Sequence, residues 1–202
     1  MSRERQKQQS EEVRTSILNI ARRIVAEQGV EALSIRRITK EMDYSAGIVY
    51  HYYKNKEEIL LCILQEGYAR IIQSIQVPDG NLTPDEAIRV SFTNYIKGAL
   101  QWPAEYKAIM LDSSPSVLEF TAVLGEGFCK KRPALQKLVS ILETGVSEGL
   151  FAPCDVQVTA QVIWSAMFGL LIRLIIERDV TPKQRKKLIE GQINMILKGL
   201  RP

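Results

Sequence analysis

Residues 34–56 constrain this chain more than any other stretch, because they predict two short helices joined by a tight turn. Ser34 can accept a hydrogen bond from the free N–H groups that begin a first helix, which then carries apolar residues at i and i+3. Asp43, of a residue type that tolerates turn conformations, follows that helix. Ser45 can cap the second helix in the same way. The stretch therefore predicts a helix-turn-helix.

The second of these helices has an unusual surface. Ala46 and Gly47 leave the backbone of its first turn bare, and tyrosines and Lys56 follow. Hydroxyl groups, lysine side chains and helix N-termini all bind phosphate groups, so the pattern predicts a helix that enters the major groove of DNA. An ordinary helical hairpin with a solvated aromatic edge is the alternative, because short helix-turn-helix patterns are weak signals.

The run from Ser45 to Lys56 reads Ser-x-Gly-x-Val-Tyr-His-Tyr-Tyr-x-Asn-Lys, and it resembles the DNA-binding domain of the TetR family of bacterial regulators. The family pattern spans about Arg14 to Leu64, with small, apolar, aromatic and basic positions at fixed spacing. The departures lie mostly in the turn, at Thr39, Met42, Asp43 and Tyr44. The resemblance implies an all-α protein with an N-terminal three-helix DNA-binding domain and a C-terminal helical domain for ligand binding and dimerisation.

The same resemblance implies which residues contact DNA. Tyr50, Tyr52 and Lys56 are expected to contact phosphates, and the small and apolar positions together with His51 are expected to face base edges. Residues near the two helix starts are expected to add backbone contacts. The predicted DNA-binding set is Ser34, Arg36, Arg37, Ser45, Ala46, Gly47, Ile48, Tyr50, His51, Tyr52 and Lys56.

The charge distribution agrees with a DNA-binding N-terminal segment. Residues 1–56 hold eleven Lys and Arg against seven Asp and Glu, whereas residues 57–202 hold sixteen of each. All of the net charge of +4 therefore lies in the first segment, as phosphate binding requires. We predict a flexible arm over residues 1–10, a DNA-binding domain over residues 11–56, and an effector-binding and dimerisation domain over residues 57–202.

Two other classes of protein remain as alternatives, a helical enzyme and a protein-interaction adaptor without DNA binding. The single histidine, His51, disfavours most zinc sites and Ser-His-Asp chemistry. Cys62, Cys129 and Cys154 have no metal-binding spacing and are typical of reduced thiols in a cytoplasmic protein. We therefore expect no catalytic residues, no metal and no cofactor. An adaptor would not explain the localised positive charge.

Residues 156–176 form a strongly apolar helix pattern that is long enough to span a bilayer. Arg173 argues against insertion, because a central arginine costs about 2.5–3.5 kcal/mol on insertion scales. A soluble helix that is apolar on nearly every side must be covered on nearly every side, so we predict a homodimer through residues 156–176 and 182–200 and no membrane contact. The predicted interface residues are Val162, Leu170, Leu171, Leu174, Ile189, Ile193 and Ile196.

Large side chains recur at helical spacing between residues 95 and 167, beside helix breaks at Pro103, Pro115 and Pro133. Such residues are often plain core, but as a group they are also typical of a cavity between helices that binds a mostly apolar ligand. The predicted effector-binding residues are Tyr95, Trp102, Tyr106, Met110, Phe120, Phe128, Trp164 and Met167. By resemblance to the family, we expect a repressor of a palindromic operator that a lipophilic or aromatic effector releases from DNA.

Overall fold

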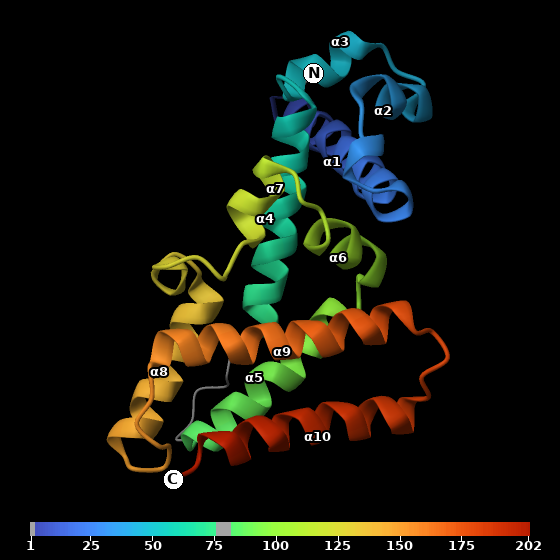
Figure 1. Ribbon diagram of the computed structural model, residues 1–202. Coiled ribbons are helices and arrows are strands. Elements are labelled where there is room, and N and C mark those ends of the chain that lie inside the picture. The colour runs from blue at the N-terminus through green and yellow to red at the C-terminus, as the bar shows by residue number, and fades with distance from the viewer. Residues whose placement is uncertain (1–2, 76–81) are drawn as a thin grey trace. The chain divides into compact units, whose positions relative to one another are not determined.

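The computed structural model describes residues 3–75 and 82–202. Within these ranges every regular element is a helix, which confirms the predicted all-α fold (Figure 1). The α-helices and the two 3-10 turns (η) are α1 (Arg3–Gln28), η1 (Val30–Ala32), α2 (Ile35–Met42), α3 (Ala46–Tyr52), α4 (Lys56–Ser74), α5 (Pro84–Ala99), α6 (Pro103–Met110), α7 (Pro115–Thr121), η2 (Phe128–Lys130), α8 (Pro133–Ser147), α9 (Val156–Ile176) and α10 (Pro182–Leu200). The sequence predicts that the helix beginning near residue 56 ends at Pro78-Asp79-Gly80, and these residues lie outside the described part of the chain.

The chain divides into two compact units. Unit 1 comprises Met1–Ala69 and Pro103–Thr121, and unit 2 comprises Arg70–Trp102 and Ala122–Pro202. These units are defined by packing, whereas the boundary predicted at residues 56/57 separates functions and stays a prediction. Helix α4 contributes residues to both units.

Unit 1 has one apolar core that joins the N-terminal helices to α6 and α7. Ile17, Ala21 and Ile24 of α1 are almost completely buried, as their spacing of four and three residues predicts. Ile109 of α6 and Val117 of α7 belong to the same cluster. The predicted three-helix domain is therefore braced by two helices that come from the middle of the chain.

Helix α1 includes most of the segment that the sequence analysis separated as an arm, since residues 3–10 are helical. This segment consists of Arg, Glu, Gln, Lys and Ser, and the first four are strong helix formers. No proline or glycine interrupts it before Gly29, which has a φ of 86° and follows the end of the helix. The flexibility of this arm stays a prediction for residues 3–10, while residues 1 and 2 lie outside the described part.

Unit 2 is built around α5, α8, α9 and α10. Helices α9 and α10 run side by side in opposite directions (Figure 1), and α5 and α8 pack against α9. The end of the chain is tied into the unit, because Ala152 donates its backbone N–H to the Leu200 carbonyl at 2.7 Å and Arg201 pairs with Asp85 at 2.6 Å.

Local sequence signals fix several helix starts. Thr83 accepts a hydrogen bond from the Glu86 N–H, and Glu86 accepts one from the Thr83 N–H at 2.9 Å, which is a capping box. Thr181 caps α10. Asp155 caps α9 by accepting from two backbone N–H groups at 3.0 and 3.1 Å, a cap that the sequence analysis missed.

A close approach between a glycine and an aromatic ring fixes the end of α8. The Phe151 side chain is buried against Gly145, where an added Cβ would lie 2.1 Å from a ring carbon. The chain can turn back after α8 and bring Phe151 against Gly145 because Gly149 has a φ of 71°, a conformation that suits glycine. Any larger residue at position 145 would displace the buried ring.

Among the described residues, α9 is the one helix that is long and apolar enough to cross a membrane by length and composition. It packs against α5, α8 and α10, as a core helix of a soluble protein does. Only 39% of its most apolar stretch is buried within the chain. A substantial apolar surface of α9 is therefore left uncovered in the isolated subunit.

Candidate nucleic-acid interface

The predicted turn between α2 and α3 is present, and its unusual residues have local explanations. Asp43 takes the left-handed conformation with a φ of 55°, which glycine would adopt at less cost. Tyr44 then donates its N–H to the Thr39 carbonyl at 3.2 Å. The buried Thr39 donates its hydroxyl to the Arg36 carbonyl at 3.0 Å. Threonine and aspartate therefore fit this turn without changing its helix-turn-helix topology.

Helix α3 is anchored on one side and open on the other. Val49 and Tyr53 are buried, with exposed fractions of 0% and 3%, as their spacing of four residues predicts. Ala46, Gly47 and His51 are exposed. The first turn of α3 therefore presents bare backbone and small side chains outward.

The caps on either side of α3 differ in their hydrogen bonds. Ser45 occupies the predicted N-cap position of α3, but its hydroxyl makes no capping hydrogen bond. At the start of α4, Asn55 accepts from the Glu58 N–H at 2.9 Å. Glu58 in turn accepts from the Lys54 N–H at 2.6 Å. Lys56 is the exposed first residue of α4.

Helix α1 holds the motif through polar side chains. Arg14 donates from its Nε to the Tyr53 hydroxyl at 3.3 Å. Burial raises the pKa of Tyr53, and the hydrogen bond from Arg14 partly opposes that rise. Arg23 pairs with Glu41 of α2, and a further arginine of α1, Arg22, pairs with a glutamate of α4. The sequence analysis missed these arginines, since a helix register alone does not reveal their partners.

All of the predicted DNA-binding residues lie in unit 1, and none is fully buried. Arg37, Ile48 and Tyr52 are half-buried. The exposed members are Ser34, Arg36, Ser45, Ala46, Gly47, Tyr50, His51 and Lys56. The structure thus brings the set together in one unit, while the individual DNA contacts stay a prediction.

The predicted interface residues of α9 and α10 divide into two groups. Leu171, Leu174 and Ile193 have exposed fractions of 0%, 4% and 1%, so they belong to the core of the subunit itself. Leu170, Ile189 and Ile196 are half-buried, and Val162 is 62% exposed. The composition of α9 could not separate these groups because nearly every position is apolar.

An exposed stripe that the prediction mostly missed runs along both helices, and we call it the α9–α10 stripe. Its residues on α9 recur at steps of three and four, which places them on one side of the helix. Its small members leave open space, since an added Cβ on its glycines would meet no atom within 4 Å. The stripe consists of Val158, Val162, Ala166, Gly169, Arg173, Ile176, Leu188, Gly191, Met195 and Gly199.

The predicted effector-binding residues are divided between the two units. Tyr106, Met110 and Phe120 belong to unit 1, whereas the other five belong to unit 2. In unit 2, Met167 is fully buried core. Trp102 is 52% exposed and lies 5.2 Å from the Arg70 guanidinium.

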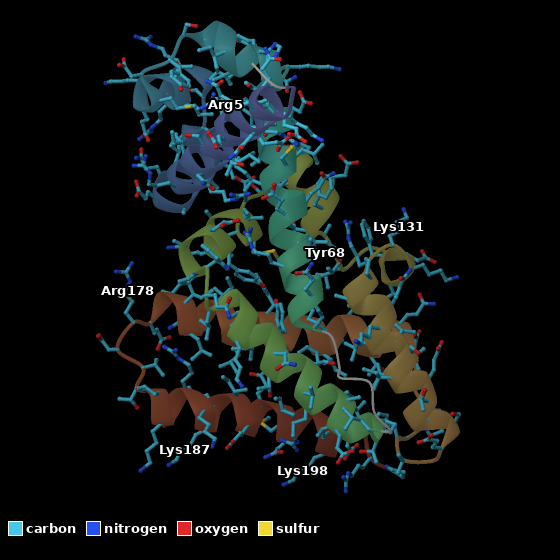
Figure 2. All side chains as sticks on the ribbon, turned by 180° about the vertical axis from the view of Figure 1, so that it is seen from behind. Arg5, Tyr68, Lys131, Arg178, Lys187 and Lys198 are labelled. Carbon is cyan, nitrogen blue, oxygen red and sulfur yellow. The ribbon has the colours of Figure 1, made fainter. Side chains whose placement is uncertain are left out.

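The remaining three aromatic residues of that set have different environments. Phe128 is flanked by Lys131 and Arg132, whose charged groups lie 5.5 and 5.2 Å from the ring centroid. Lys131 is labelled in Figure 2. Tyr95 and Trp164 pack together with ring centroids 4.9 Å apart, and both line a small cavity in unit 2. Of the predicted set, these two residues are therefore the best candidates for contact with a ligand.

The three cysteines are free thiols in different environments. Cys154 is exposed, Cys62 is half-buried and Cys129 is buried. Burial raises the pKa of the Cys129 thiol, and the Asp155 carboxylate nearby raises it further. Across residues 3–75 and 82–202, no group of three or more His, Cys, Asp or Glu side chains is arranged to hold a metal ion.

Comparison with known sequences places the match on the helix-turn-helix. Residues 17–63 match the family model described as bacterial regulatory proteins, tetR family. The transcriptional repressor AcnR of Corynebacterium efficiens is 34% identical over 62 residues, which cover 31% of this chain and 33% of that protein. Across the curated relatives that it matches, the chain spans about a third to half of their length, and these relatives are named as regulators.

Solved structures resemble the chain over nearly its whole length. FadR of Bacillus subtilis, solved in complex with stearoyl-CoA, is 18% identical and has a TM-score of 0.73, covering 93% of this chain and 99% of that one. FadR of Bacillus halodurans, a fatty acid degradation regulator, is 19% identical with the same TM-score, covering 93% of this chain and 95% of that one. At these identities the likeness establishes a shared fold.

Proposed function

The chain belongs to the TetR family of bacterial regulatory proteins, and from this premise we propose that it is a cytoplasmic, DNA-binding transcriptional repressor that acts as a homodimer. The observation that carries the proposal is the two-sided character of α3. Val49 and Tyr53 fix the helix in the core, while Ala46, Gly47 and His51 face outward. A short helix anchored in this way can enter a major groove without losing its packing.

The proposed docking divides α3 and its surroundings by chemistry. Ala46, Gly47, Ile48 and His51 contact base edges, because small side chains let the helix backbone approach the bases closely. The hydroxyls of Tyr50 and Tyr52 and the ammonium group of Lys56 contact phosphates, together with backbone contacts near Ser34, Arg36, Arg37 and Ser45. The net charge of +4 in residues 1–56 favours this face as the one that meets DNA.

The proposed dimer forms when the α9–α10 stripe of one subunit packs against the same stripe of a second. Exposed Val162 and Met195, 62% and 75% accessible, supply apolar area, and the glycines of the stripe allow close helix contact. A two-fold dimer of this kind places two α3 helices in successive major grooves, about 34–36 Å apart. The operator is then palindromic.

The proposed effector binds unit 2 and lowers operator affinity. The solved complex of FadR of Bacillus subtilis with stearoyl-CoA supports a lipophilic ligand for this fold. An effector shifts the equilibrium only if it binds the DNA-incompetent conformation better than the competent one. Helix α4 contributes to both units, so we propose that it carries the shift, with a coupling of about 5–150-fold.

Selection of binding sites from randomised duplex DNA tests the DNA-binding proposal directly. The full chain is expected to enrich a palindrome, and fluorescence anisotropy of that duplex should give two chains per site. The affinity should fall steeply between about 50 and 200 mM salt, because phosphate contacts release counterions. Failure to enrich any sequence, together with affinity for duplex DNA that does not depend on salt, would contradict the proposal.

A further inference from the structure

Between α7 and α8 the chain forms a loop over residues 122–132, which includes η2 and which we call the closed loop. Arg132, at the N-cap of α8, donates from its Nε to the Ala122 carbonyl at 3.0 Å, so the two ends of the loop are joined. The Phe128 ring lies so close to Gly125 that an added Cβ there would be 2.2 Å from a ring carbon. Loops whose ends meet and whose own side chains pack inside them are compact and frequently functional.

The closed loop is fixed to the first half of α9 at two points (Figure 1). The Gln161 side-chain amide donates to the carbonyls of Val123 and Gly125, at 2.8 and 3.1 Å. One turn earlier on α9, the Gln157 carbonyl accepts from the buried Cys129 thiol at 3.5 Å. The backbone of the loop is therefore held in place by α9 as well as by its own contacts.

Leu124 is the residue that this arrangement presents to solvent. Its side chain is 70% exposed, although the residues on either side of it are the two whose carbonyls bind Gln161. Burial of apolar area is the main favourable contribution to folding and association, and most of this leucine contributes nothing of that kind within the subunit. A leucine held outward by a fixed backbone is therefore available to a partner.

The position of Gln161 places the closed loop beside the α9–α10 stripe. Val158 and Val162 belong to the stripe and are 53% and 62% exposed. Gln161 follows Val158 by three residues, which is about 60° around a helix of 3.6 residues per turn. The loop that Gln161 holds therefore borders the stripe, and Leu124 extends its apolar surface beyond the two helices.

We propose that the closed loop is a third part of the homodimer interface, in which Leu124 of each subunit packs against the α9–α10 stripe of the other. This inference rests on the proposed function, which supplies the dimer, and it adds an element outside the two long helices. The glycines of the stripe leave open space, because an added Cβ on them would meet no atom within 4 Å, and a side chain from the partner can occupy that space. In a two-fold dimer the same contact occurs twice.

Sedimentation of the full chain over a range of concentrations tests this inference. Leu124→Ala should weaken dimerisation about 30-fold, because two leucine contacts are lost from each dimer. Leu124→Glu should weaken it about 100-fold or more, since it places a carboxylate against an apolar surface. Leu111→Glu is the matched control, because Leu111 is 52% exposed in unit 1 and belongs neither to the closed loop nor to the stripe. The control should dimerise like the unaltered chain.

Two glutamine variants test whether the support of the loop matters. Gln161→Ala removes both hydrogen bonds to the loop, so it should weaken dimerisation about tenfold and speed hydrogen exchange of the loop amides. Gln157→Ala changes the same residue type one turn earlier, where the loop binds the backbone carbonyl instead of the side chain. Both measurements should be unchanged in that variant.

Alkylation locates the contact without relying on a loss of association. In a chain that carries Cys62→Ser and Cys154→Ser, the thiol of a Leu124→Cys variant should react with iodoacetamide more slowly once the concentration exceeds the dimer dissociation constant of that variant. The thiol of a Leu111→Cys variant should react at one rate throughout. Thermal unfolding of each variant establishes that it is folded at the temperature of the measurement.

A reaction rate at position 124 that does not depend on concentration, or normal dimerisation of Leu124→Glu, would overturn the inference. The second result would mean that the leucine meets a different partner. A dimer that Val162→Glu abolishes and Leu124→Glu leaves intact refutes the role of the closed loop alone. A wild-type chain that stays monomeric refutes the proposed homodimer itself.

Discussion

Two surfaces of this chain, the outer face of α3 and the α9–α10 stripe, both expose side chains that differ from an ordinary charged surface. The face of α3 is made of small residues, tyrosine hydroxyls and histidine, in the segment that carries all of the net positive charge. The stripe instead exposes Val162, Ile176 and Met195, with glycines between them. Aliphatic side chains match another aliphatic surface, whereas hydroxyls and cations match phosphates.

Exposure alone therefore does not identify a binding surface, but exposure together with chemistry identifies the kind of partner. It also makes the two surfaces separable by experiment. Changes in the stripe should act on association first and on DNA binding as a consequence. Changes near α3 should act on DNA binding and leave association intact.

The largest effect is expected from a charge placed in the stripe. Val162→Glu or Met195→Glu should give monomers, because each puts a carboxylate in the centre of an apolar contact. Operator affinity should fall about 100-fold or more, since the two α3 helices then bind independently. Sedimentation and anisotropy on the same samples measure both effects.

Lys187→Glu is the matched control for the stripe. Lys187 points outward from α10 (Figure 2) and lies outside the stripe, although its substitution changes the charge by more. This variant should remain dimeric. A dimeric Val162→Glu protein, or a wild-type chain that sediments as a monomer at micromolar concentration, would contradict the proposed interface.

The next largest effect is expected inside unit 2, where neither surface is touched. Gly145→Ala should lower the free energy of unfolding by about 1–3 kcal/mol, because its methyl group overlaps the buried Phe151 ring. Urea denaturation measures the loss. Gly145→Ala combined with Phe151→Leu should recover part of it, and below the unfolding transition the single variant should still associate and bind DNA.

A smaller effect is expected at the edge of the DNA-binding face. Lys56→Ala should weaken binding to all duplexes several-fold and lower the salt slope by about one, because one phosphate contact is lost. His51→Ala or Ile48→Ala should instead change the sequence preference. An unchanged salt slope in Lys56→Ala would mean that the proposed docking is wrong.

The smallest effect concerns the anchor of α3 and its dependence on pH. Burial raises the pKa of Tyr53 in the folded state, so the neutral phenol is favoured there. Its contribution to stability is complete below the unfolded pKa of about 10 and is lost as pH rises through the folded pKa. Tyr53→Phe should therefore show a slightly weaker loss of stability between neutral and alkaline pH than wild type. Identical profiles would contradict this account.

Much of the fold was predictable because local chemistry determines helix starts. These signals act within one turn of the chain: the capping box of Thr83 and Glu86, the cap at Thr181, and the prolines at the first helical positions. The burial of Val49 and Tyr53 was also predictable, since a spacing of four residues places them on one side of α3. The candidate DNA-binding set followed from the same stretch.

The rest depends on contacts between distant segments. Nothing in the sequence of α6 and α7 indicated that Ile109 and Val117 would join the core of unit 1. Leu171 looked available to a partner because α9 is apolar on nearly every side, so periodicity could not orient it. The pairing of Arg14 with Tyr53 crosses 39 positions in the sequence and becomes visible only after folding.

The unequal environments of the cysteines make the chain suitable for spectroscopy after a single substitution. Thiols add to maleimide reagents, and Cys154 presents an exposed thiol, whereas burial raises the pKa of the Cys129 thiol and shields it. Substituting the half-buried Cys62 leaves a single attachment point in unit 2, next to the start of α9. A nitroxide spin label there would report one distance per dimer, and that distance would follow the geometry of the subunits as ligand and operator are added.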